Sequence, residues 1–592
     1  MSRQRPPRSL ALLGGRPVHG NQARVGLDPH EPLRAALGPA RGPARHCGSV
    51  QPELRTRATE VFGWTLRPDQ ESVIDAVLDR RDALAVMPTG SGKSAIYQVA
   101  GLGLDGLVVV VSPLVALQED QVVGLEHHPD APRAVALNAT KKARDVADAW
   151  DAVAAGEVGY VFLAPEQLVK DDVLERLRDA GVALVAVDEA HCISSWGHDF
   201  RPDYLALGEV AERLGRPPLL ALTATGSAPV RDDIVERLGM RDPFVLASGF
   251  DRPGIRLEVV RHAEDAEKRQ AVVDQVAELD GPTVVYVATR AATTEYADAL
   301  AARGRRAQPY HAGMRVAERE AVHTGFLDGG VDVVVATSAF GMGIDKPDVR
   351  YVVHADVPES IDAYYQEIGR AGRDAEPAGA TLHYRAEDFG LRTFFASGSP
   401  RPASVRAVFD AVPATGSIAR SALVEASGLS SRTAGRALNA LLDAGALRDD
   451  VDGVSRVPDG PQDADRAARA TADRAAERER VEESRIAMMR QLAETTGCRR
   501  QFLLGYFGDE LPEPCGNCDT CSSGTARDAS AHVADGANDE AWPPDARVEH
   551  AEWGTGVVMS TEEDRITVFF ESAGYRTLAL ADVEQRDLLE RV

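Results

Sequence analysis

Short, almost wholly apolar runs alternate with longer amphipathic stretches from about residue 55 to about residue 395. The runs are rich in valine and are apolar on both faces, which is typical of strands in parallel sheets covered by helices. They read ALAVM, LVVVVS, YVFLAP, LVAVDEA, LLALTAT, TVVYVAT, DVVVATS and YVVHADV. The pattern predicts an α/β fold with two tandem parallel-sheet domains, residues 55–248 and 249–395.

The pattern changes after residue 400. Residues 403–460 predict two helices around a GLS turn and then a small hairpin, the order found in a winged helix. Residues 461–522 predict a helix that leads into a cysteine cluster, and the polar residues 523–544 indicate a linker. Short alternating strands in 545–592 favour a small SH3- or Tudor-like β-barrel. Residues 1–54, rich in Arg, Pro and Gly, predict a disordered arm.

Length and charge limit the class of protein. A chain of 592 residues exceeds one hydrophobic core, and about 150 residues per domain gives about four units. No apolar run approaches the roughly 18 residues that span a bilayer, and the N-terminus lacks a signal-peptide core, so we expect a cytoplasmic protein without membrane contact. The net charge of −25 does not exclude nucleic acid, because a tracking groove needs only a local basic lining.

A phosphate-binding loop is predicted at residues 87–94, MPTGSGKS, because the segment follows a strand and opens a helix. The loop residues that would face phosphate are Thr89, Gly90, Ser91 and Gly92. Lys93 would reach the β- and γ-phosphates of ATP, Ser94 would ligate Mg²⁺, and the helix N-terminus favours the negative charge. Met87 stands where the general pattern has Gly, so the match is partial.

Two adjacent carboxylates, Asp188 and Glu189, follow the apolar run LVAV about 95 residues after the loop. The first can hold Mg²⁺, and the second can orient the attacking water. A solvated acidic pair is the alternative, but acids directly after a buried strand at this distance are expected of P-loop ATPases. The two segments together predict ATP hydrolysis.

Four of the six cysteines, Cys498, Cys515, Cys518 and Cys521, lie within 24 residues. Their arrangement, one cysteine on a predicted helix and then C-x₂-C-x₂-C, offers four thiolates to a tetrahedral Zn²⁺. An iron–sulfur cluster is the competing interpretation, whereas a disulfide framework does not fit this spacing.

Together the motifs resemble the RecQ family of superfamily 2 helicases over about residues 60–390 and the cysteine region. The segments that carry the resemblance are LRPDQES, MPTGSGKS, VSPLVALQEDQV, LAPEQL, DEAHCISSWGHDFRPDY, ALTAT, YHAGM, ATSAFGMGIDKPDVR and QEIGRAGRD. The resemblance implies two RecA-like domains, and the sequences CRRQ and GNCD around the cysteines match the family's structural zinc module.

The resemblance also implies roles for individual residues of the nucleotide site. Arg67 and Gln70 would recognise adenine, with Trp64 as a further stacking partner, although Asp69 stands where the family often has Gly. Arg373 would be an arginine finger supplied by the second domain. Gln366 and Arg370 would support it.

The resemblance also implies that a loop after the acidic pair couples DNA binding to hydrolysis. Trp196, His198, Phe200 and Arg201 could stack on bases whatever their identity. Trp196 and Phe200 could equally be core residues, although their polar and glycine neighbours favour a loop. Thr225 and Thr337 lie in segments that would relay domain closure between nucleotide and DNA.

Two features depart from the family. The predicted winged helix precedes the cysteines instead of following them, and the C-terminus lacks a recognisable helical nucleic-acid module. The VDG hairpin could still separate strands from this unusual position. Arg432 and Arg436 could contact phosphates or form a plain solvated face.

The leading hypothesis is an ATP-dependent 3′–5′ DNA helicase that acts in repair or recombination on single strands and duplex junctions, with ATP, Mg²⁺ and Zn²⁺ as cofactors. The alternative is a remodeller that moves along DNA without separating strands, and RNA is a third possible substrate. The C-terminal barrel resembles the Tudor-like modules of some other bacterial helicases. It would bind a protein partner or simply stabilise the chain.

Overall fold

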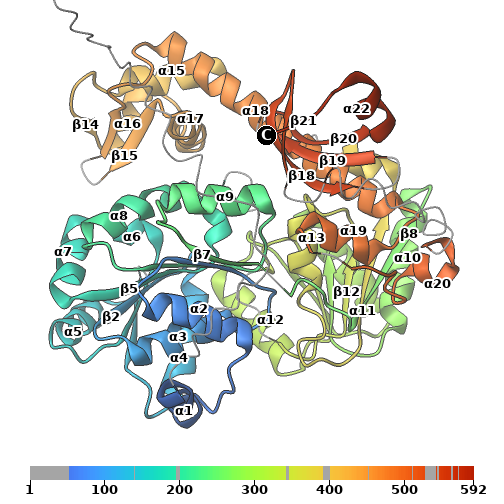
Figure 1. Ribbon diagram of the computed structural model, residues 1–592, viewed down its shortest axis with the longest axis horizontal. Coiled ribbons are helices and arrows are strands. Elements are labelled where there is room, and N and C mark those ends of the chain that lie inside the picture. The colour runs from blue at the N-terminus through green and yellow to red at the C-terminus, as the bar shows by residue number, and fades with distance from the viewer. Residues whose placement is uncertain are drawn as a thin grey trace, which may run out of the picture. The chain divides into compact units, whose positions relative to one another are not determined.

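The computed structural model describes residues 52–592, except 139–140, 195–200, 248, 342–345, 391–399, 451–452, 510, 527–541, 543–545, 562–564 and 571. Figure 1 shows this structure, with many of its helices and strands labelled.

The first domain is built on a seven-stranded parallel sheet with the order β3-β4-β2-β5-β6-β1-β7. The strands are β1 (Ala83–Val86), β2 (Leu107–Val111), β3 (Ala134–Leu137), β4 (Tyr160–Leu163), β5 (Val182–Val187), β6 (Leu219–Thr223) and β7 (Phe244–Ala247). Alternate residues of β1 face different cores, Leu84 and Val86 on one side and Ala83 and Ala85 on the other. The sheet is therefore buried on both faces, as the apolar runs predicted.

Helices cover both faces of this sheet, with α2 and α3 on one face and α8 and α9 on the other (Figure 1). The helices are α1 (Pro52–Phe62), α2 (Pro68–Leu78), α3 (Lys93–Gly103), α4 (Val115–Glu126), α5 (Ala143–Ala154), α6 (Pro165–Leu168), α7 (Asp171–Ala180), α8 (Leu207–Arg213) and α9 (Ala228–Arg237). Two short 3₁₀ helices, η1 (Ala190–Ile193) and η2 (Pro202–Ala206), follow β5.

The second domain has a six-stranded parallel sheet with the order β10-β11-β9-β12-β13-β8. Its strands are β8 (Ile255–Arg261), β9 (Thr283–Tyr286), β10 (Ala307–Tyr310), β11 (Val333–Ala336), β12 (Tyr351–His354) and β13 (Ala378–Tyr384). Its helices are α10 (Asp265–Glu278), α11 (Arg290–Ala302), α12 (Val316–Leu327) and α13 (Ile361–Ile368). Two parallel sheets in sequence confirm the predicted architecture.

The winged-helix segment has its own core. Its elements are α15 (Pro402–Ala411), β14 (Ser417–Ile418), α16 (Arg420–Ser427), α17 (Ser431–Asp443), β15 (Leu447–Asp450) and β16 (Gly453–Arg456). Helix α17 buries Leu438 and Leu441 in that core, whereas Arg432 and Arg436 are exposed. The tip of the VDG hairpin, residues 451–452, lies outside the described residues.

A long helix, α18 (Ala464–Glu494), connects the winged-helix segment to the cysteine region. It begins at Asp463, whose side chain accepts a hydrogen bond from the backbone N–H of Arg466 (2.8 Å) and caps the helix. It packs against α15 and α17 near one end and against β20 of the C-terminal module further along. The shorter helices α19 (Arg499–Tyr506) and α20 (Asp519–Ser523) carry the cysteine region.

The C-terminal module is a five-stranded antiparallel sheet with the order β20-β19-β18-β17-β21. Its elements are β17 (Arg547–His550), β18 (Gly554–Thr561), β19 (Arg565–Phe570), β20 (Gly574–Ala579), α22 (Leu580–Arg586) and β21 (Glu590–Arg591). In the part of the chain that the structure describes, no helix has both the length and the apolar composition needed to cross a membrane.

Candidate functional site

The predicted phosphate loop connects β1 to α3. Gly90 (φ 78°) and Gly92 (φ 74°) adopt left-handed backbone conformations that favour glycine, and α3 begins at Lys93. A side chain at position 92 would collide with a neighbour, because an added Cβ would lie 2.7 Å from Nε2 of Gln70. The loop therefore presents the N-terminus of α3, the geometry that binds phosphate groups.

Lys93 lies within this loop. Its Nζ donates to the carbonyl oxygens of Met87 (3.0 Å) and Pro88 (3.2 Å). Burial lowers its pKa, and the nearby carboxylates of Glu189 and Asp188 oppose that shift. A lysine ammonium held at the N-terminus of α3 can bind the phosphate groups of a polyphosphate ligand such as ATP.

Asp188 and Glu189 follow β5 directly. The backbone N–H of Asp188 donates to the carbonyl of Val111 (2.8 Å), and that of Glu189 donates to Oδ1 of Asp188 (3.0 Å). Burial raises the pKa of Asp188 to about 7, and the adjacent charge of Glu189 adds to the shift. Two partly buried carboxyl groups side by side favour a cation between them, so this oxygen set fits Mg²⁺, and Ser94 would be a further ligand.

His191 links the acidic pair to β6. Its Nδ1 lies 3.3 Å from Oε2 of Glu189 and 2.9 Å from Oγ1 of Thr223, and Thr223 donates to the carbonyl of Thr225 (2.8 Å). Burial lowers the pKa of His191 to about 3, which keeps the ring neutral near pH 7. Thr225 is itself buried and is connected to Glu189 through Thr223 and His191.

Gln70 braces the phosphate loop. Its Nε2 donates to the carbonyls of Ser91 (3.1 Å) and Gly92 (3.0 Å), and its Oε1 accepts from the backbone N–H of Arg67 (2.9 Å). Trp64 stacks on Phe62 with ring centroids 4.6 Å apart. The segment expected to recognise adenine therefore lies against the phosphate loop.

The second domain brings Arg373 to the same loop. An added Cβ on Gly90 would lie 3.4 Å from Cγ of Arg373, and the charge of Arg373 contributes to lowering the pKa of Lys93. Gln366 on α13 and Arg370 just after it are buried nearby. The expected finger and its supporting residues thus come from one turn and helix of the second domain.

Arg252, in the segment that joins the two sheets, was not predicted from the sequence. Its Nη1 donates to the carbonyls of Thr89 (3.1 Å) and Gly369 (3.3 Å), and its Nη2 donates to that of Ala371 (3.0 Å). It therefore connects the phosphate loop to the turn that carries Arg370 and Arg373. The sequence shows only that an arginine lies at the domain boundary and does not indicate which groups it contacts.

The expected DNA-coupling residues are only partly described. Trp196, His198 and Phe200 lie outside the described residues. Arg201 donates from Nη1 to the carbonyl of Pro113 (3.0 Å), which places it at the end of β2. Thr337 follows β11, and its backbone N–H donates to the carbonyl of Tyr310 (3.2 Å).

The four predicted cysteines meet at one point, with their sulfur atoms all within 4.8 Å of one another. Tetrahedral Zn²⁺ with Zn–S bonds of about 2.3 Å needs sulfurs about 3.8 Å apart. Backbone N–H groups of Cys515 and Asn517 donate to the sulfurs of Cys498 and Cys515, both at 3.3 Å, which favours thiolates. Cys498 directly precedes α19 and is not within it.

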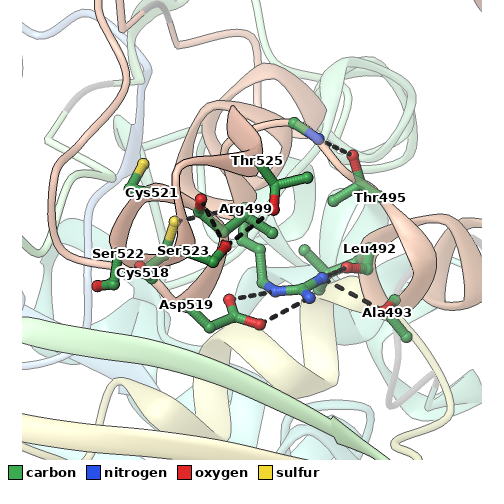
Figure 2. A network of polar contacts seen from close by, with 12 residues as sticks. Leu492, Ala493, Thr495, Arg499, Cys518, Asp519, Cys521, Ser522, Ser523 and Thr525 are labelled. Atoms are coloured by element: carbon green, nitrogen blue, oxygen red, sulfur yellow. Dashed lines mark hydrogen bonds and ion pairs between the residues drawn. The ribbon is translucent and has the colours of Figure 1, made fainter. Parts of the chain in front are cut away.

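Arg499 lies beside the cysteine cluster, and Figure 2 shows its polar contacts next to Cys518 and Cys521. It donates from Nε and Nη2 to the two carboxylate oxygens of Asp519 (2.6 and 2.8 Å) and from Nη1 to the carbonyl of Leu492 (2.6 Å). This paired contact joins the helix after Cys498 to the helix after Cys518 and to the end of α18.

The zinc module docks on β8, the edge strand of the second sheet. Leu257 pairs with Cys518 in a short parallel bridge, and the side chain of Asn517 donates to the carbonyl of Pro253 (2.9 Å). Arg500 donates to Oδ1 of Asp251 (2.9 Å). The module thus covers an edge that would otherwise be open to pairing with other chains.

A phosphate loop and acidic pair in one parallel-sheet domain, with an arginine from a second such domain, define a two-domain ATPase of the superfamily 2 helicase class. Comparison with family models agrees. Four segments match, with these descriptions: "DEAD/DEAH box helicase" for residues 67–233, "Helicase conserved C-terminal domain" for 267–375, "RecQ zinc-binding" for 461–522, and "Protein of unknown function (DUF3553)" for 546–585.

Similar curated proteins indicate which family of this helicase class the chain belongs to. The chain is 40% identical over 342 residues to the probable ATP-dependent DNA helicase RecS of Bacillus subtilis, covering 57% of this chain and 68% of that protein. It is 34% identical over 462 residues to the ATP-dependent DNA helicase RecQ of Pasteurella multocida and 33% identical to that of Haemophilus influenzae. Those alignments cover 78% of this chain but only 61% and 62% of the two RecQ proteins. The chain belongs to the RecQ-like family of ATP-dependent DNA helicases.

Proposed function

We propose that this chain is an ATP-driven 3′–5′ DNA translocase that separates DNA strands. The observation that carries the proposal is the position of Arg373 against Gly90 of the phosphate loop, because a site completed by both domains makes hydrolysis depend on how the domains lie together. Polarity and a place in repair or recombination follow from the family.

Each residue of the nucleotide site would have its own role in ATP hydrolysis. Mg²⁺ and ATP, when bound, supply the scissile phosphoanhydride and its charge neutralisation. Lys93 would hold the phosphates, Ser94 and Asp188 the cation, and Glu189 would orient the attacking water. Arg373 would stabilise charge in the transition state, a contribution of about 10³ to 10⁵ in rate for arginine fingers.

The experiment that tests the proposal is hydrolysis with and without single-stranded DNA. Lys93→Ala should abolish both hydrolysis and the opening of a forked duplex with a 3′ tail. Lys170→Ala is the matched control, because Lys170 is an exposed lysine of the same domain. Hydrolysis that is unchanged in Lys93→Ala would contradict the proposal.

One observation favours a second function, a remodeller that translocates without unwinding. The hairpin of β15 and β16 precedes the zinc module in the chain, so a strand-separating wedge would come from an unusual position. Displacement of streptavidin from a biotinylated single strand, without opening of the fork, would support the remodeller. Competition between DNA and RNA for stimulation of hydrolysis would decide the substrate.

A further inference from the structure

The C-terminal module matches a family of unknown function, yet it does not stand apart from the motor. Strand β18 packs against α9 of the first domain and α19 of the zinc module, and β20 packs against α18. Arg547 of the module lies 3.5 Å from Oδ2 of Asp232 on α9. The module thus contacts both the first domain and the zinc region.

A buried chain of hydroxyl groups runs through these contacts. Oη of Tyr575, on β20, lies 3.3 Å from Oγ of Ser227 and 2.9 Å from Oη of Tyr506. Tyr506 in turn donates to Oδ2 of Asp362 at 2.5 Å. All four side chains are at most 7% exposed. The chain joins four elements that lie far apart in the sequence: α9, β20, α19 and α13.

Ser227 forms the end of this hydroxyl chain at which the contact is longest. It precedes α9 at the position where serine usually caps the helix, but its side chain makes no capping hydrogen bond. Its hydroxyl is instead within reach of Tyr575. At 3.3 Å this is the longest of the three contacts, whereas Tyr506 contacts Tyr575 and Asp362 at shorter distances.

Each end of this chain of hydroxyl groups lies close to one half of the ATPase site. Ser227 comes two residues after Thr225, which is hydrogen-bonded to Thr223 and so connected to His191 and Glu189. At the other end, Asp362 lies in the first turn of α13, the helix that leads to Arg370 and Arg373.

We infer that the C-terminal module is an internal bridge of the motor, in which Tyr575 positions the segment after β6 relative to α13. The inference rests on the proposed function and assigns this module a part in it. Because a hydroxyl has one proton, Tyr575 can donate to Ser227 or to Tyr506 but not to both at once, so the Ser227 contact can break while the rest of the hydroxyl chain persists. Opening of the two domains would break it first.

The test uses Tyr575→Phe and Ser227→Ala in the full chain. Phenylalanine keeps the ring, which packs on Phe569 (5.0 Å between centroids), and removes only the hydroxyl. Thr577→Val is the matched control, because Thr577 lies on the same strand and accepts a hydrogen bond from Gln491 of α18 instead. Zinc content and melting temperature verify that each variant is folded.

Loss of one hydrogen bond between the halves should lower DNA-stimulated kcat about 3- to 10-fold, with little change in the KM for ATP. The double variant should be no worse than Tyr575→Phe alone, since that variant already removes the contact with Ser227 as well as the one with Tyr506. Thr577→Val should match the unaltered protein. Normal DNA-stimulated rates in Tyr575→Phe would overturn the bridge and leave docking of a protein partner or plain stabilisation as the module's role.

A second measurement separates the bridge from the proposed function. Amide hydrogen exchange in the first turn of α9, without nucleotide or DNA, should be faster in Tyr575→Phe than in Thr577→Val. This readout does not need catalysis. If the unaltered chain fails to hydrolyse ATP, the proposed function fails while the exchange still tests the bridge, and unchanged exchange in Tyr575→Phe overturns it.

Discussion

Arg252 donates a hydrogen bond to the carbonyl of Thr89 across the boundary between the two α/β domains, at 3.1 Å. The same guanidinium reaches the carbonyls of Gly369 and Ala371, next to Arg370 and Arg373. One side chain in the segment between the sheets thus contacts both the phosphate loop and the turn that carries Arg370 and Arg373.

Arg252→Ala should therefore lower kcat for DNA-stimulated hydrolysis more than it raises the KM for ATP. Hydrogen bonds from a charged donor contribute about 1.5–3 kcal/mol each, so a loss of about 10-fold or more is expected. Arg252→Lys should rescue only partly, because an ammonium cannot reproduce the planar fork.

Arg256→Ala serves as the control for this prediction, because Arg256 is exposed and donates to Ser522 outside the ATPase site. Steady-state hydrolysis over a range of ATP concentrations measures both constants. A purely binding defect in Arg252→Ala, with normal kcat, would show that the alignment does not matter for catalysis.

Gln70→Ala should raise the KM for ATP and for GTP by similar factors. Both amide hydrogens of Gln70 are engaged by the carbonyls of Ser91 and Gly92, so the side chain shapes the loop that binds the phosphates common to both nucleotides. Hydrolysis assays with the two nucleotides provide the measurement. A rise confined to ATP would instead assign Gln70 to adenine recognition.

Removal of zinc should destabilise more than the cysteine region. Zinc sites of this kind contribute on the order of 10 kcal/mol to folding, and here the module covers β8 and joins the hydroxyl chain through Tyr506. We expect about one zinc per chain by elemental analysis. A strong chelator should then lower the melting temperature and cause aggregation.

Asp519→Asn is the milder probe of the same centre, because it weakens the paired contact with Arg499 and leaves all four cysteines in place. It should retain zinc but release it faster to a chelator. If the cysteine module unfolds on removal of zinc and the thermal unfolding of the two sheets does not change, the prediction that zinc stabilises more than the cysteine region is wrong.

The sequence predicted the parts whose signals are local. Apolar runs identify the strands, since a strand buried on both faces needs apolar residues at every position, and the phosphate loop and cysteine spacing carry their chemistry within a few residues. Arg252, Ser227 and Tyr575 were missed for the opposite reason. Their hydrogen-bond partners lie up to 348 residues away in the sequence. A single polar residue in a sequence does not indicate which distant residue it will contact in the folded protein.

His191 shows how one buried group should affect stability as the pH falls. Its folded pKa is lowered to about 3, chiefly by burial, with the charge of Lys93 contributing, while an unfolded histidine titrates near 6.5. Between these values the unfolded chain binds the extra proton. The stability that neutral His191 contributes is therefore complete above pH 6.5 and is lost as the pH falls, by about 1.4 kcal/mol per pH unit.

His191→Gln should flatten the decline in melting temperature between pH 6.5 and 5 relative to the unaltered chain. His383, whose pKa is lowered to about 4 by burial, adds a similar slope that this variant leaves in place. The same variant should weaken the stimulation of hydrolysis by DNA, because it alters the two contacts through which His191 links Glu189 to Thr223. Thermal unfolding across this pH range decides the matter: an identical decline in both proteins would mean that His191 is already protonated in the fold.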